Sequence, residues 1–440
     1  MDLGATPLAN AYLRPEQLTD VEEYYPLRLV RCERCFLVQV EAVVPPRVLF
    51  RDYAYFSSYS DTLLRESKQY ALSICERLGL AEGDRVVEIA SNDGYLLQYF
   101  LERGLNVQGI EPADTVAAAA VRKGIPTLVR FFGTEVAREL AAEGRRGHLI
   151  VANNVLAHVP DPGDFIDGLK ILLEPGGTIT IEFHHLLSLI EKGQFDTIYH
   201  EHFQYLSLTT AMETLAARGL TVVDVDEIPA QGGSLRLYIR HTEDVAEGRV
   251  HAGPKVANLL ARELAAGVRT REVYQRLGER IRTMKLQLLS FLVTARQAGQ
   301  SVVAYGAAAK GNTLLNYCGV HADLIDYVVD RNPHKQGMYL PGSRVPIVHP
   351  ERVMATRPDY VLVLPWNLSA EIIEQMSDIR NWGGRFVIPV PELTISPLVS
   401  EKTVRVAVTP ATGAPSRVPV PASDASRRSS DLSVPLRSGT

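Results

Sequence analysis

Short apolar runs alternate with amphipathic stretches over the middle of the chain. Strands are expected at 85–91, 106–110, 126–129, 149–152 and 178–183, with helices at 95–103 and 115–123. Repeated strand–helix units predict a parallel sheet with helices on both faces, which is an α/β fold. Two alternating runs at 221–228 and 234–241, on either side of Pro229 and two glycines, predict an antiparallel hairpin that closes this sheet.

The flanking segments have different patterns. Two short strands, 27–31 and 36–40, are joined by a turn that contains Cys32 and Cys35, and a helix is expected at 61–80. Apolar residues recur every three or four positions over 255–298, which predicts one long helix. Strands at 301–305, 324–329, 360–364 and 385–390 predict a second, smaller doubly wound unit. The segment from about 399 onward has no periodicity and is expected to be disordered. The expected parts are therefore 1–50, 51–250, 251–299, 300–398 and 399–440.

Length, composition and charge narrow the class of protein. The 440 residues exceed a single core, and the 46% hydrophobic and 22% charged residues are those of an ordinary globular protein. A net charge of −5 provides no basic stripe for a nucleic acid. The sequence shows neither an apolar leader nor a run of about 18 apolar residues, so a cytoplasmic protein without a membrane partner is expected. Four cysteines with one CxxC do not indicate a disulfide framework.

A cofactor site is expected where the strand at 85–91 ends. Glu88, Ala90, Asn92, Asp93 and Gly94 form an acidic turn with one glycine before a helix. About 20 residues later the next strand ends in Glu111 and Pro112, a position from which a carboxylate binds a ribose diol. A single glycine disfavours a dinucleotide and favours a nucleoside cofactor without phosphates, whose positive charge the acids would tolerate. Asn153 and Asn154 end another strand facing the same crevice. An ordinary strand–turn–helix with solvated acids is the alternative.

A chemical centre is expected at Tyr199, His200, Glu201 and His202. Two histidines, a carboxylate and a phenol in four residues are more titratable groups than a structural segment needs. If the segment is extended, His200 and His202 share one face, so the spacing does not decide which of them meets a substrate. A metal site on the two histidines and a structural, hydrogen-bonded cluster are the alternatives.

A nucleotide site is expected in the C-terminal unit. The strand at 301–305 runs into small residues followed by Lys310 and Asn312 at the start of a helix, where an ammonium and a helix N-terminus would meet a diphosphate. Asp330 and Lys335 follow the next strand with further polar groups. Small residues at such a point also serve helix–sheet packing, which is the alternative.

Seven segments occur in the same order as in the sugar C-methyltransferases that make the branched deoxysugars of antibiotics, and this chain resembles that family over about 1–395. The segments are 7–10 (Pro-Leu-Ala-Asn), the knuckle with Cys32 and Cys35, 55–60 (Tyr-Phe-Ser-Ser-Tyr-Ser), 88–94, 152–158, 199–202 and 306–316. The resemblance implies a class I S-adenosylmethionine methyltransferase Rossmann-like domain. A small zinc-ribbon-like N-terminal piece would precede it and a Rossmann-like C-terminal domain would follow. Its ligands would be S-adenosylmethionine and a dTDP-4-keto-deoxysugar.

The same resemblance implies a role for each matching residue. His202 would be the general base at the carbon beside the ketone, assisted by Tyr199, Glu201 and His158. Histidine suits that task because its ordinary pKa is near 6.5. The residues expected to bind the nucleotide-sugar are Tyr53, Lys310, Asn312, Asn316, Asp330 and Lys335.

The chain departs from the family at its start, since the family carries another CxxC ahead of the Pro-Leu-Ala-Asn segment. Cys32 and Cys35 are thus half of a zinc site, and we expect the other pair in the upstream reading frame. Two rival functions remain. One is an O- or N-methyltransferase, which would need neither an enolate stabiliser nor a second nucleotide domain. The other is a nucleotide-sugar-binding protein without catalysis.

Overall fold

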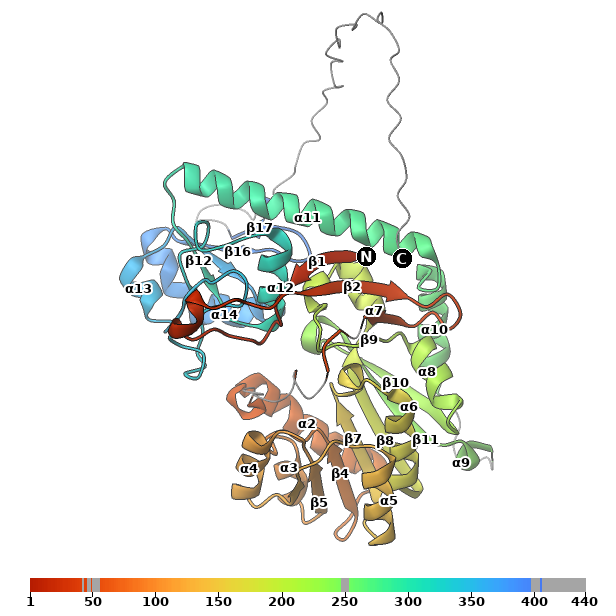
Figure 1. Cartoon of the computed structure of the whole chain (residues 1–440). Helices are drawn as coiled ribbons and strands as arrows, with labels where there is room; N and C mark the ends of the chain where they lie inside the picture. Colours follow the sequence, from red (N-terminus) through yellow and green to blue (C-terminus); the bar gives the residue numbers. More distant parts are fainter. Residues whose placement is uncertain (42, 46–48, 50–55, 247–252, 397–403, 406–440) are drawn as a thin grey trace, which may run out of the picture. The chain divides into compact units, whose positions relative to one another are not determined.

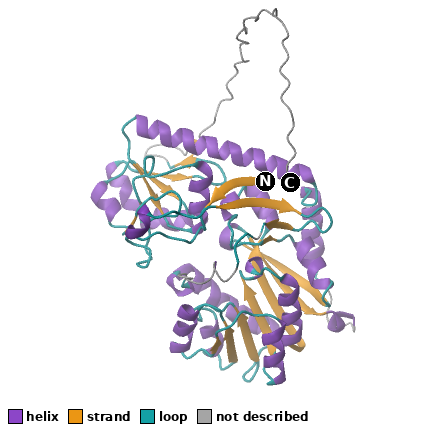
Figure 2. Ribbon diagram, in the orientation of Figure 1, coloured by secondary structure: helices purple, strands orange, loops and turns teal. Residues whose placement is uncertain are grey.

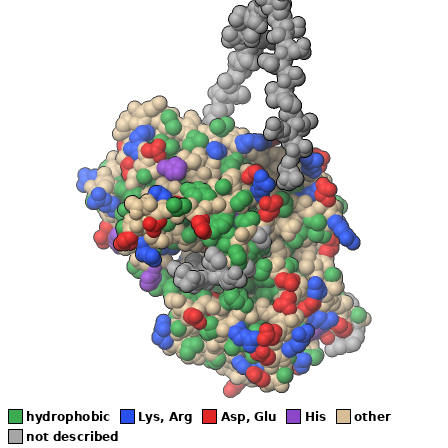
Figure 3. Space-filling view, in the orientation of Figure 1, with side chains coloured by type: hydrophobic (Ala, Val, Ile, Leu, Met, Phe, Trp, Pro, Cys, Tyr) green, Lys and Arg blue, Asp and Glu red, His purple; other side chains and the backbone are tan. Residues whose placement is uncertain are grey.

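The computed structural model describes residues 1–41, 43–45, 49, 56–246, 253–396 and 404–405, and within them the strands form three sheets (Figure 1). None of the helices in these residues combines the length and apolar character needed to cross a bilayer. On the face drawn in Figure 3, acidic and basic side chains are interspersed rather than gathered into a basic stripe.

The middle sheet has the order β10-β11-β8-β7-β4-β5-β6. Its strands are β4 (Arg85–Ile89), β5 (Asn106–Ile110), β6 (Thr127–Leu128), β7 (Gly147–Asn153), β8 (Leu173–His184), β10 (Leu220–Ile228) and β11 (Ser234–His241). All neighbours are parallel except β11, which runs antiparallel to both β8 and β10. This arrangement confirms the expected hairpin and the class I methyltransferase fold.

Helices cover both faces of the middle sheet (Figure 2) because alternate strand residues point to opposite sides. Val86 and Leu149 pack with apolar residues of α2 (Asp61–Leu78) and α3 (Leu97–Leu101). Their neighbours Val87 and Ile150 pack instead with α5 (Thr134–Ala142) and α6 (Pro162–Leu172). α4 (Asp114–Arg122) joins the first layer, and α8 (Leu208–Ala216) joins the second. The carboxyl ends of the parallel strands are left for a ligand.

The N-terminal sheet is antiparallel and combines strands from two parts of the chain. Its order is β1 (Asp2–Thr6), β2 (Tyr25–Arg31), β3 (Val38–Val40) and β9 (Gln204–Tyr205). The sequence predicts β2 and β3, whereas β1 and β9 are not expected from it. β9 begins two residues after His202 and pairs with β3. The N-terminal sheet is therefore completed by the strand that follows residues 196–202, which are called the histidine segment below.

The C-terminal sheet has the order β14-β13-β12-β15-β16-β17-β18. Its strands are β12 (Val302–Tyr305), β13 (Val328–Val329), β14 (Ile347–Val348), β15 (Tyr360–Val363), β16 (Arg385–Ile388), β17 (Thr394–Ile395) and β18 (Val404–Arg405). The first five are parallel and the last two antiparallel. Its helices include α12 (Ala309–Cys318), α13 (Arg352–Thr356) and α14 (Ser369–Gln375). The predicted tail, 399–440, lies outside the described residues apart from β18.

The single helix predicted over 255–298 is wrong. The segment forms α10 (Pro254–Ala266) and α11 (Arg271–Gln297), and Gly267 ends α10 with a left-handed φ of 76°. A glycine takes this conformation without a steric penalty, and helices often end in this way. α11 shares one apolar core with the N-terminal sheet, α7 (Leu186–Lys192) and one face of the C-terminal sheet, so it connects these parts.

Candidate active site

The turn after β4 is wound tightly by three residues in the left-handed region. Ala90, Asn92 and Gly94 have φ values of 56°, 51° and 76°. A Cβ on Gly94 would lie 2.3 Å from Ile125 Cδ1, so another residue there would have to displace Ile125 and adopt a positive φ, which favours glycine. Left-handed conformations at non-glycine residues are disfavoured and are concentrated at ligand sites. This turn is referred to below, with Glu111, as the cofactor turn.

Glu111 ties the ends of β4 and β5 together. Its Oε2 accepts the Asn92 N–H at 3.0 Å and its Oε1 accepts the Ala113 N–H at 2.9 Å. Burial raises the pKa of Glu111 although both N–H groups favour the ionised form. Each carboxylate oxygen has a second lone pair, so the pair of oxygens can still accept from a ribose diol. Pro112 follows directly at the same strand end.

Two further buried acids, Glu88 and Asp93, lie at the cofactor turn. Burial raises the pKa of Glu88 well above its ordinary value, the charges of Glu111 and Asp93 add to this, and Tyr95 opposes it. Asp93 is buried, and its Oδ2 lies 3.2 Å from Lys123 Nζ while its Oδ1 has no partner among the described residues. A positively charged ligand would lower the electrostatic repulsion among these acids, whereas a diphosphate would increase it.

A short segment covers the cofactor turn. The Ser57 N–H donates to Asn92 Oδ1 at 3.0 Å, and Lys123 Nζ donates to Ser58 Oγ at 2.8 Å. Phe56 and Tyr59 in the same segment stack on His334, with ring centroids 6.1 and 6.4 Å away. Tyr53, which was expected to bind the substrate, lies outside the described residues.

Asn153 and Asn154 end β7, next to the cofactor turn. Asn153 Oδ1 is buried without a partner in the described part of the chain. Asn154 has a left-handed φ of 53° and lines a small cavity with His158 and His202. The β7 end therefore lies between the cofactor turn and the histidines.

The segment 199–202 is a turn, not a strand. The His202 N–H donates to the Tyr199 carbonyl at 3.0 Å, so His200 and His202 point in different directions. His200 Nε2 faces the Tyr25 and Pro26 carbonyls at 3.3 and 3.2 Å. The two histidines would share a face only in an extended segment, and this segment is a turn. His200 faces the N-terminal sheet, and His202 faces His158.

His202 is held as a neutral imidazole. Its Nδ1 lies 3.0 Å from the Thr197 carbonyl oxygen, and because a carbonyl only accepts, Nδ1 carries the hydrogen and Nε2 the lone pair. The His158 ring lies 4.6 Å away and the Tyr199 ring 4.0 Å away. Burial lowers the pKa of His202 well below its ordinary value, and the charges of His158 and His184 lower it further. Burial likewise lowers the pKa of His158 to about 4.

The three histidines 158, 184 and 202 line a cavity of about 30 Å³, which has room for about one water molecule. His184 Nε2 lies 2.6 Å from Gln194 Oε1, and burial lowers its pKa to about 3. No group of three metal-ligating side chains is assembled within the residues that the structure describes. The arrangement thus places three buried imidazoles, each with a lowered pKa, around one small cavity.

Glu201 faces away from this cavity. It is buried, and Asn10 Nδ2 lies 2.8 and 3.0 Å from its two oxygens. Burial raises the pKa of Glu201 to about 7, and the Asn10 hydrogen bond opposes the shift. The Glu201 backbone carbonyl faces His158 Nδ1 at 2.9 Å. Glu201 therefore contacts His158 through its backbone and Asn10 through its side chain.

The predicted nucleotide site is divided. Lys310 Nζ is buried, 3.1 Å from Asn367 Oδ1, 3.3 Å from Gln231 Oε1 and 5.1 Å from the centre of the Trp366 ring. Burial lowers the pKa of Lys310 to about 8. Lys310 therefore faces the hairpin of the middle sheet.

The other predicted substrate residues lie elsewhere in the C-terminal unit. Asp330 Oδ2 accepts the Ala307 N–H at 2.8 Å, and Lys335 Nζ donates to the Ala307 carbonyl at 2.7 Å, at the ends of β12 and β13. Asn312 and Asn316 donate to the Ala9 and Pro341 carbonyls. The structure brings Asp330 and Lys335 together, and it does not place Lys310 with them.

Sequence reasoning missed the partners that hold this region. Trp366 Nε1 donates to Asp196 Oδ2 at 2.6 Å, and burial raises the pKa of Asp196 to about 6. His184 and Asn10 were also not expected near the histidine segment. A buried acid one residue before Thr197 is a signal that could have been noticed, but its partner 170 positions away could not.

Cys32 and Cys35 lie at the β2–β3 turn as expected. The Cys35 and Arg34 N–H groups lower the pKa of Cys32, an arrangement that favours a thiolate. A structural zinc needs four ligands, and these two cysteines have no further ligand among the described residues. They do not fit a zinc ion by themselves.

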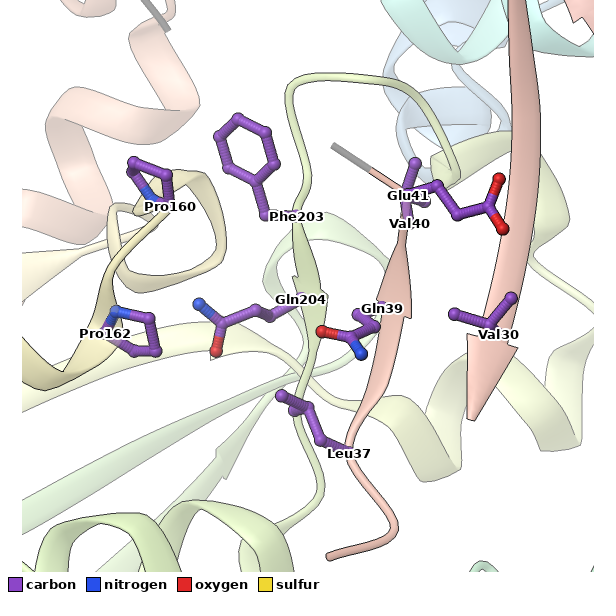
Figure 4. A pocket seen from close by; sticks show the side chains of 9 residues that line it. All are labelled: Val30, Leu37, Gln39, Val40, Glu41, Pro160, Pro162, Phe203 and Gln204. Carbon is purple, nitrogen blue, oxygen red and sulfur yellow. The ribbon is translucent and has the colours of Figure 1, made fainter. Parts of the chain in front are cut away.

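A larger cavity of about 250 Å³ lies beside this sheet (Figure 4), between β2, β3 and the loop that follows β7. It is lined by Val30, Leu37, Gln39, Val40, Glu41, Pro160, Pro162, Phe203 and Gln204. Glu41 is the charged side chain in this lining, so the cavity does not match an anionic nucleotide.

Three family models match successive parts of the chain. They are a putative zinc binding domain over 1–50, a methyltransferase domain over 59–225 and a C-methyltransferase C-terminal domain over 229–391. The C-methyltransferase NovU of Streptomyces niveus is 36% identical over 392 residues, which cover 89% of this chain and 92% of that protein. A ubiquinone biosynthesis O-methyltransferase of Pseudomonas aeruginosa is 33% identical over 108 residues, 24% of this chain and 46% of that protein.

Among solved structures, the glycopeptide N-methyltransferase MtfA complexed with S-adenosylmethionine is 17% identical and covers 43% of this chain and 99% of its own, with a TM-score of 0.32. The sheet order, the cofactor turn and the family models together define an S-adenosylmethionine-dependent C-methyltransferase. Because the relationship to NovU extends over nearly the whole length of both proteins, the chain belongs to the sugar C-methyltransferase family.

Proposed function

We propose that this enzyme methylates the ring carbon next to the ketone of a nucleotide-linked 4-keto-deoxysugar, with dTDP as the nucleotide. The observation that carries the proposal is the His202 imidazole, oriented by the Thr197 carbonyl at 3.0 Å at the buried cavity it shares with His158. A carbon nucleophile exists only after a base has removed the proton beside a carbonyl, whereas a hydroxyl or amine needs no such step. An imidazole that is oriented in advance at a buried cavity supports carbon methylation.

His202 would take the proton through Nε2. Burial lowers the pKa of His202 well below its ordinary value, which favours the neutral ring with its lone pair on Nε2. The imidazolium that forms would be costly in a buried site, but the enolate forms in the same step. Its negative charge offsets the cost because opposite charges attract strongly where water is excluded.

The developing enolate oxygen requires hydrogen-bond donors. Tyr199, whose ring packs 4.0 Å from His202, is the donor we assign to it, and one such donor is worth about 2.7–4 kcal/mol in comparable sites. The hydrogen of neutral His158 faces the Glu201 backbone carbonyl, so His158 lines the cavity without donating to the enolate. Glu201, with a pKa of about 7, can hold or release a proton at neutral pH and assists from the other side of the segment.

S-adenosylmethionine, when bound, supplies the electrophilic methyl group. We assign its ribose to Glu111 and its positive charge to Glu88 and Asp93, whose buried carboxylates match a cation. The backbone of Ala90, Asn92 and Gly94 would line the S-adenosylmethionine site, together with the strand-end residues Pro112, Asn153 and Asn154. These assignments rest on the fit between acceptor groups and a cofactor that carries donors and no phosphate.

We assign the nucleotide-sugar to the C-terminal unit. Asp330 and Lys335 contact Ala307 just before α12, and Lys310 lies 5.1 Å from the centre of the Trp366 ring. Asn312 and Asn316 lie on α12 between them. Lys310 would have to leave its Gln231 and Asn367 partners to bind a phosphate. A zinc ion on Cys32 and Cys35 would need two ligands beyond the described residues.

The test is to incubate the protein with methyl-labelled S-adenosylmethionine and dTDP-4-keto-deoxysugars and to locate the label by NMR. We expect the label on a carbon next to the ketone. In deuterated water without S-adenosylmethionine, the substrate's α-hydrogen should exchange. Label on oxygen or nitrogen without α-exchange would establish the rival methyltransferase activity instead, and binding without either reaction would establish a non-catalytic protein.

A further inference from the structure

Asn10 connects residues 9–13, called the N-terminal segment below, to the histidine segment. Its Nδ2 reaches both oxygens of Glu201, at 2.8 and 3.0 Å, across 191 positions of sequence. Glu201 is 4% exposed, and Asn10 is the side chain that hydrogen-bonds its carboxyl within the described residues, whereas Asn10 itself lies at the surface. The amide therefore both orients the carboxyl and covers it from solvent.

The N-terminal segment does not need this bond to stay in place. The Ala9 carbonyl accepts from Asn312 Nδ2 at 2.6 Å, and the Tyr12 hydroxyl donates to the Ala307 carbonyl at 2.6 Å. Leu13 and Tyr339 exchange two backbone hydrogen bonds, at 3.0 and 2.8 Å. These contacts all attach the segment to the C-terminal unit. Asn10 is the contact that faces the histidine segment, so anchoring alone does not account for it.

Holding Glu201 also holds a histidine. The Glu201 carbonyl lies 2.9 Å from His158 Nδ1, and the His158 ring packs 4.6 Å from His202. A rotation of the Glu201 side chain and peptide would therefore disturb the two rings that line the cavity. The chain of contacts runs from Asn10 through Glu201 to His158 and His202.

We propose that Asn10 is a positioning residue for the methylation reaction, which holds the Glu201 carboxyl in a single orientation and makes the N-terminal segment part of the active site. This inference rests on the proposed function of Glu201 as an assisting group. The titratable group that faces Glu201 from the N-terminal segment is the Tyr12 phenol, and Lys335 lies beyond it, with Nζ 5.0 Å from the centre of the Tyr12 ring. From its own segment Glu201 is flanked by His200 and His202, which point elsewhere.

The inference predicts how Glu201 titrates. An amide N–H donor favours the ionised carboxylate, so its removal should raise the pKa of Glu201 above about 7. Infrared difference spectra of the protonated carboxyl band, with Glu201→Gln as the blank, follow this titration without any substrate. Asn10→Ala removes the donor and the side chain, whereas Asn10→Asp keeps the shape but replaces the donor by a second carboxyl, whose charge adds to the upward shift. We expect both variants to shift the Glu201 titration upward.

The same two Asn10 variants should also change the rate of methyl transfer. Asn10→Asp and Asn10→Ala should lower kcat roughly tenfold, the equivalent of one hydrogen bond to a charged group, without changing KM for S-adenosylmethionine. Asn381→Ala, at an exposed asparagine that contacts Asp378, is the matched control and should behave as the parent. The double variant Asn10→Asp/Glu201→Gln restores a hydrogen bond with donor and acceptor exchanged. It should recover the thermal stability of the pair but stay at the activity of Glu201→Gln.

Three results would overturn the inference: unchanged kcat in Asn10→Ala, an unmoved Glu201 titration, or full activity in the exchanged pair. The last would show that the contact is structural only. Failure of the proposed function is distinguishable, because it would appear as a parent enzyme that does not methylate the keto-sugar. The infrared titration would still decide whether Asn10 controls Glu201.

Discussion

The cofactor turn is held together by residues close in sequence, whereas the histidine segment is held by residues from all parts of the chain. Asn92 and Glu111 are 19 positions apart, Asp93 and Lys123 are 30 apart, and Ser57 and Asn92 are 35 apart. In the histidine segment, Glu201 bonds Asn10 across 191 positions, Asp196 bonds Trp366 across 170, and Ile198 bonds Thr313 across 115.

This difference shows how the two halves of a methyl transfer are built here. The cofactor site that we propose would use the ends of adjacent parallel strands, which the middle sheet provides by itself. The proton abstraction that we propose would depend on a short irregular segment, which the N-terminal and C-terminal parts contact. Changes in those distant parts should therefore affect the chemical step and leave cofactor affinity unchanged.

The largest effect should come from the histidine side of the comparison. His202→Asn removes the proposed base and should lower methyl transfer by about 10²–10⁴-fold, the usual contribution of a general base. Calorimetric affinity for S-adenosylmethionine should not change. His349→Ala, at an exposed histidine of the C-terminal unit, is the control for a generic loss of imidazole. Retained turnover and α-exchange in a folded His202→Asn protein would contradict the mechanism.

The converse variant is Glu111→Gln in the cofactor turn. An amide cannot accept at both oxygens as the carboxylate does from Asn92 and Ala113, so the turn and the ribose site are weakened together. The Kd for S-adenosylmethionine should rise about 10- to 100-fold, as for a lost hydrogen bond to a charged group. Glu135→Gln, at an exposed acid of α5, is the control. If α-hydrogen exchange without S-adenosylmethionine also fell, the two regions would not be separable as argued.

Trp366→Phe should affect stability in a pH-dependent way. Burial raises the pKa of Asp196 to about 6, above the ordinary value of about 4, so the native state favours the protonated acid. Ionisation therefore lowers the free energy of unfolding as pH rises from about 4 to 6, and the Trp366 N–H limits that loss. Without it, the free energy of unfolding should fall by about 1–3 kcal/mol at pH 8 and by less at pH 5.

Urea denaturation at the two pH values measures this difference. Trp382→Phe is a matched control, because its Nε1 donates to the neutral Pro358 carbonyl at 3.0 Å and should give the same loss at both pH values. Equal losses for Trp366→Phe at pH 5 and pH 8 would mean that Asp196 does not titrate in this range.

The sequence predicts the position of the turn after β4 well because strand ends and the residues after them are local features, whereas its binding of a cofactor stays a prediction. Glu88, Asp93 and Glu111 were expected together and are joined by the pairing of β4 with β5. The middle sheet, its hairpin and most of its strands follow for the same reason. The break at Gly267 was missed because one glycine costs a helix only about 1 kcal/mol, so the apolar periodicity on both sides outweighed it.

The histidine segment could be located from sequence but not oriented. Its two histidines point in different directions because a single backbone hydrogen bond, from the His202 N–H to the Tyr199 carbonyl, closes a turn. Hydrophobic periodicity does not predict such a bond. Strand β9 has two residues and exists through its pairing with β3. Lys310 was expected at a phosphate, but the hairpin of the middle sheet and Trp366 cover it. This cover arises from packing between parts far apart in the sequence, which a sequence pattern does not reveal.

The smallest predicted effect separates the two regions most cleanly, because it uses the same chemical change in each. Thr313 Oγ1 donates to the Ile198 carbonyl at 3.0 Å in the histidine region, and Thr127 Oγ1 donates to the Ile125 carbonyl at 3.1 Å beside the cofactor turn. Replacing either threonine by valine removes one hydroxyl-to-carbonyl bond and should lower the free energy of unfolding by about 0.5–1.5 kcal/mol. Only Thr313→Val, which frees the carbonyl next to Tyr199, should also lower kcat, by a few-fold, with an unchanged Kd for S-adenosylmethionine. Single-turnover kinetics measure the difference, and equal kcat values for the two variants would show that the distant contacts stabilise the fold without orienting the base.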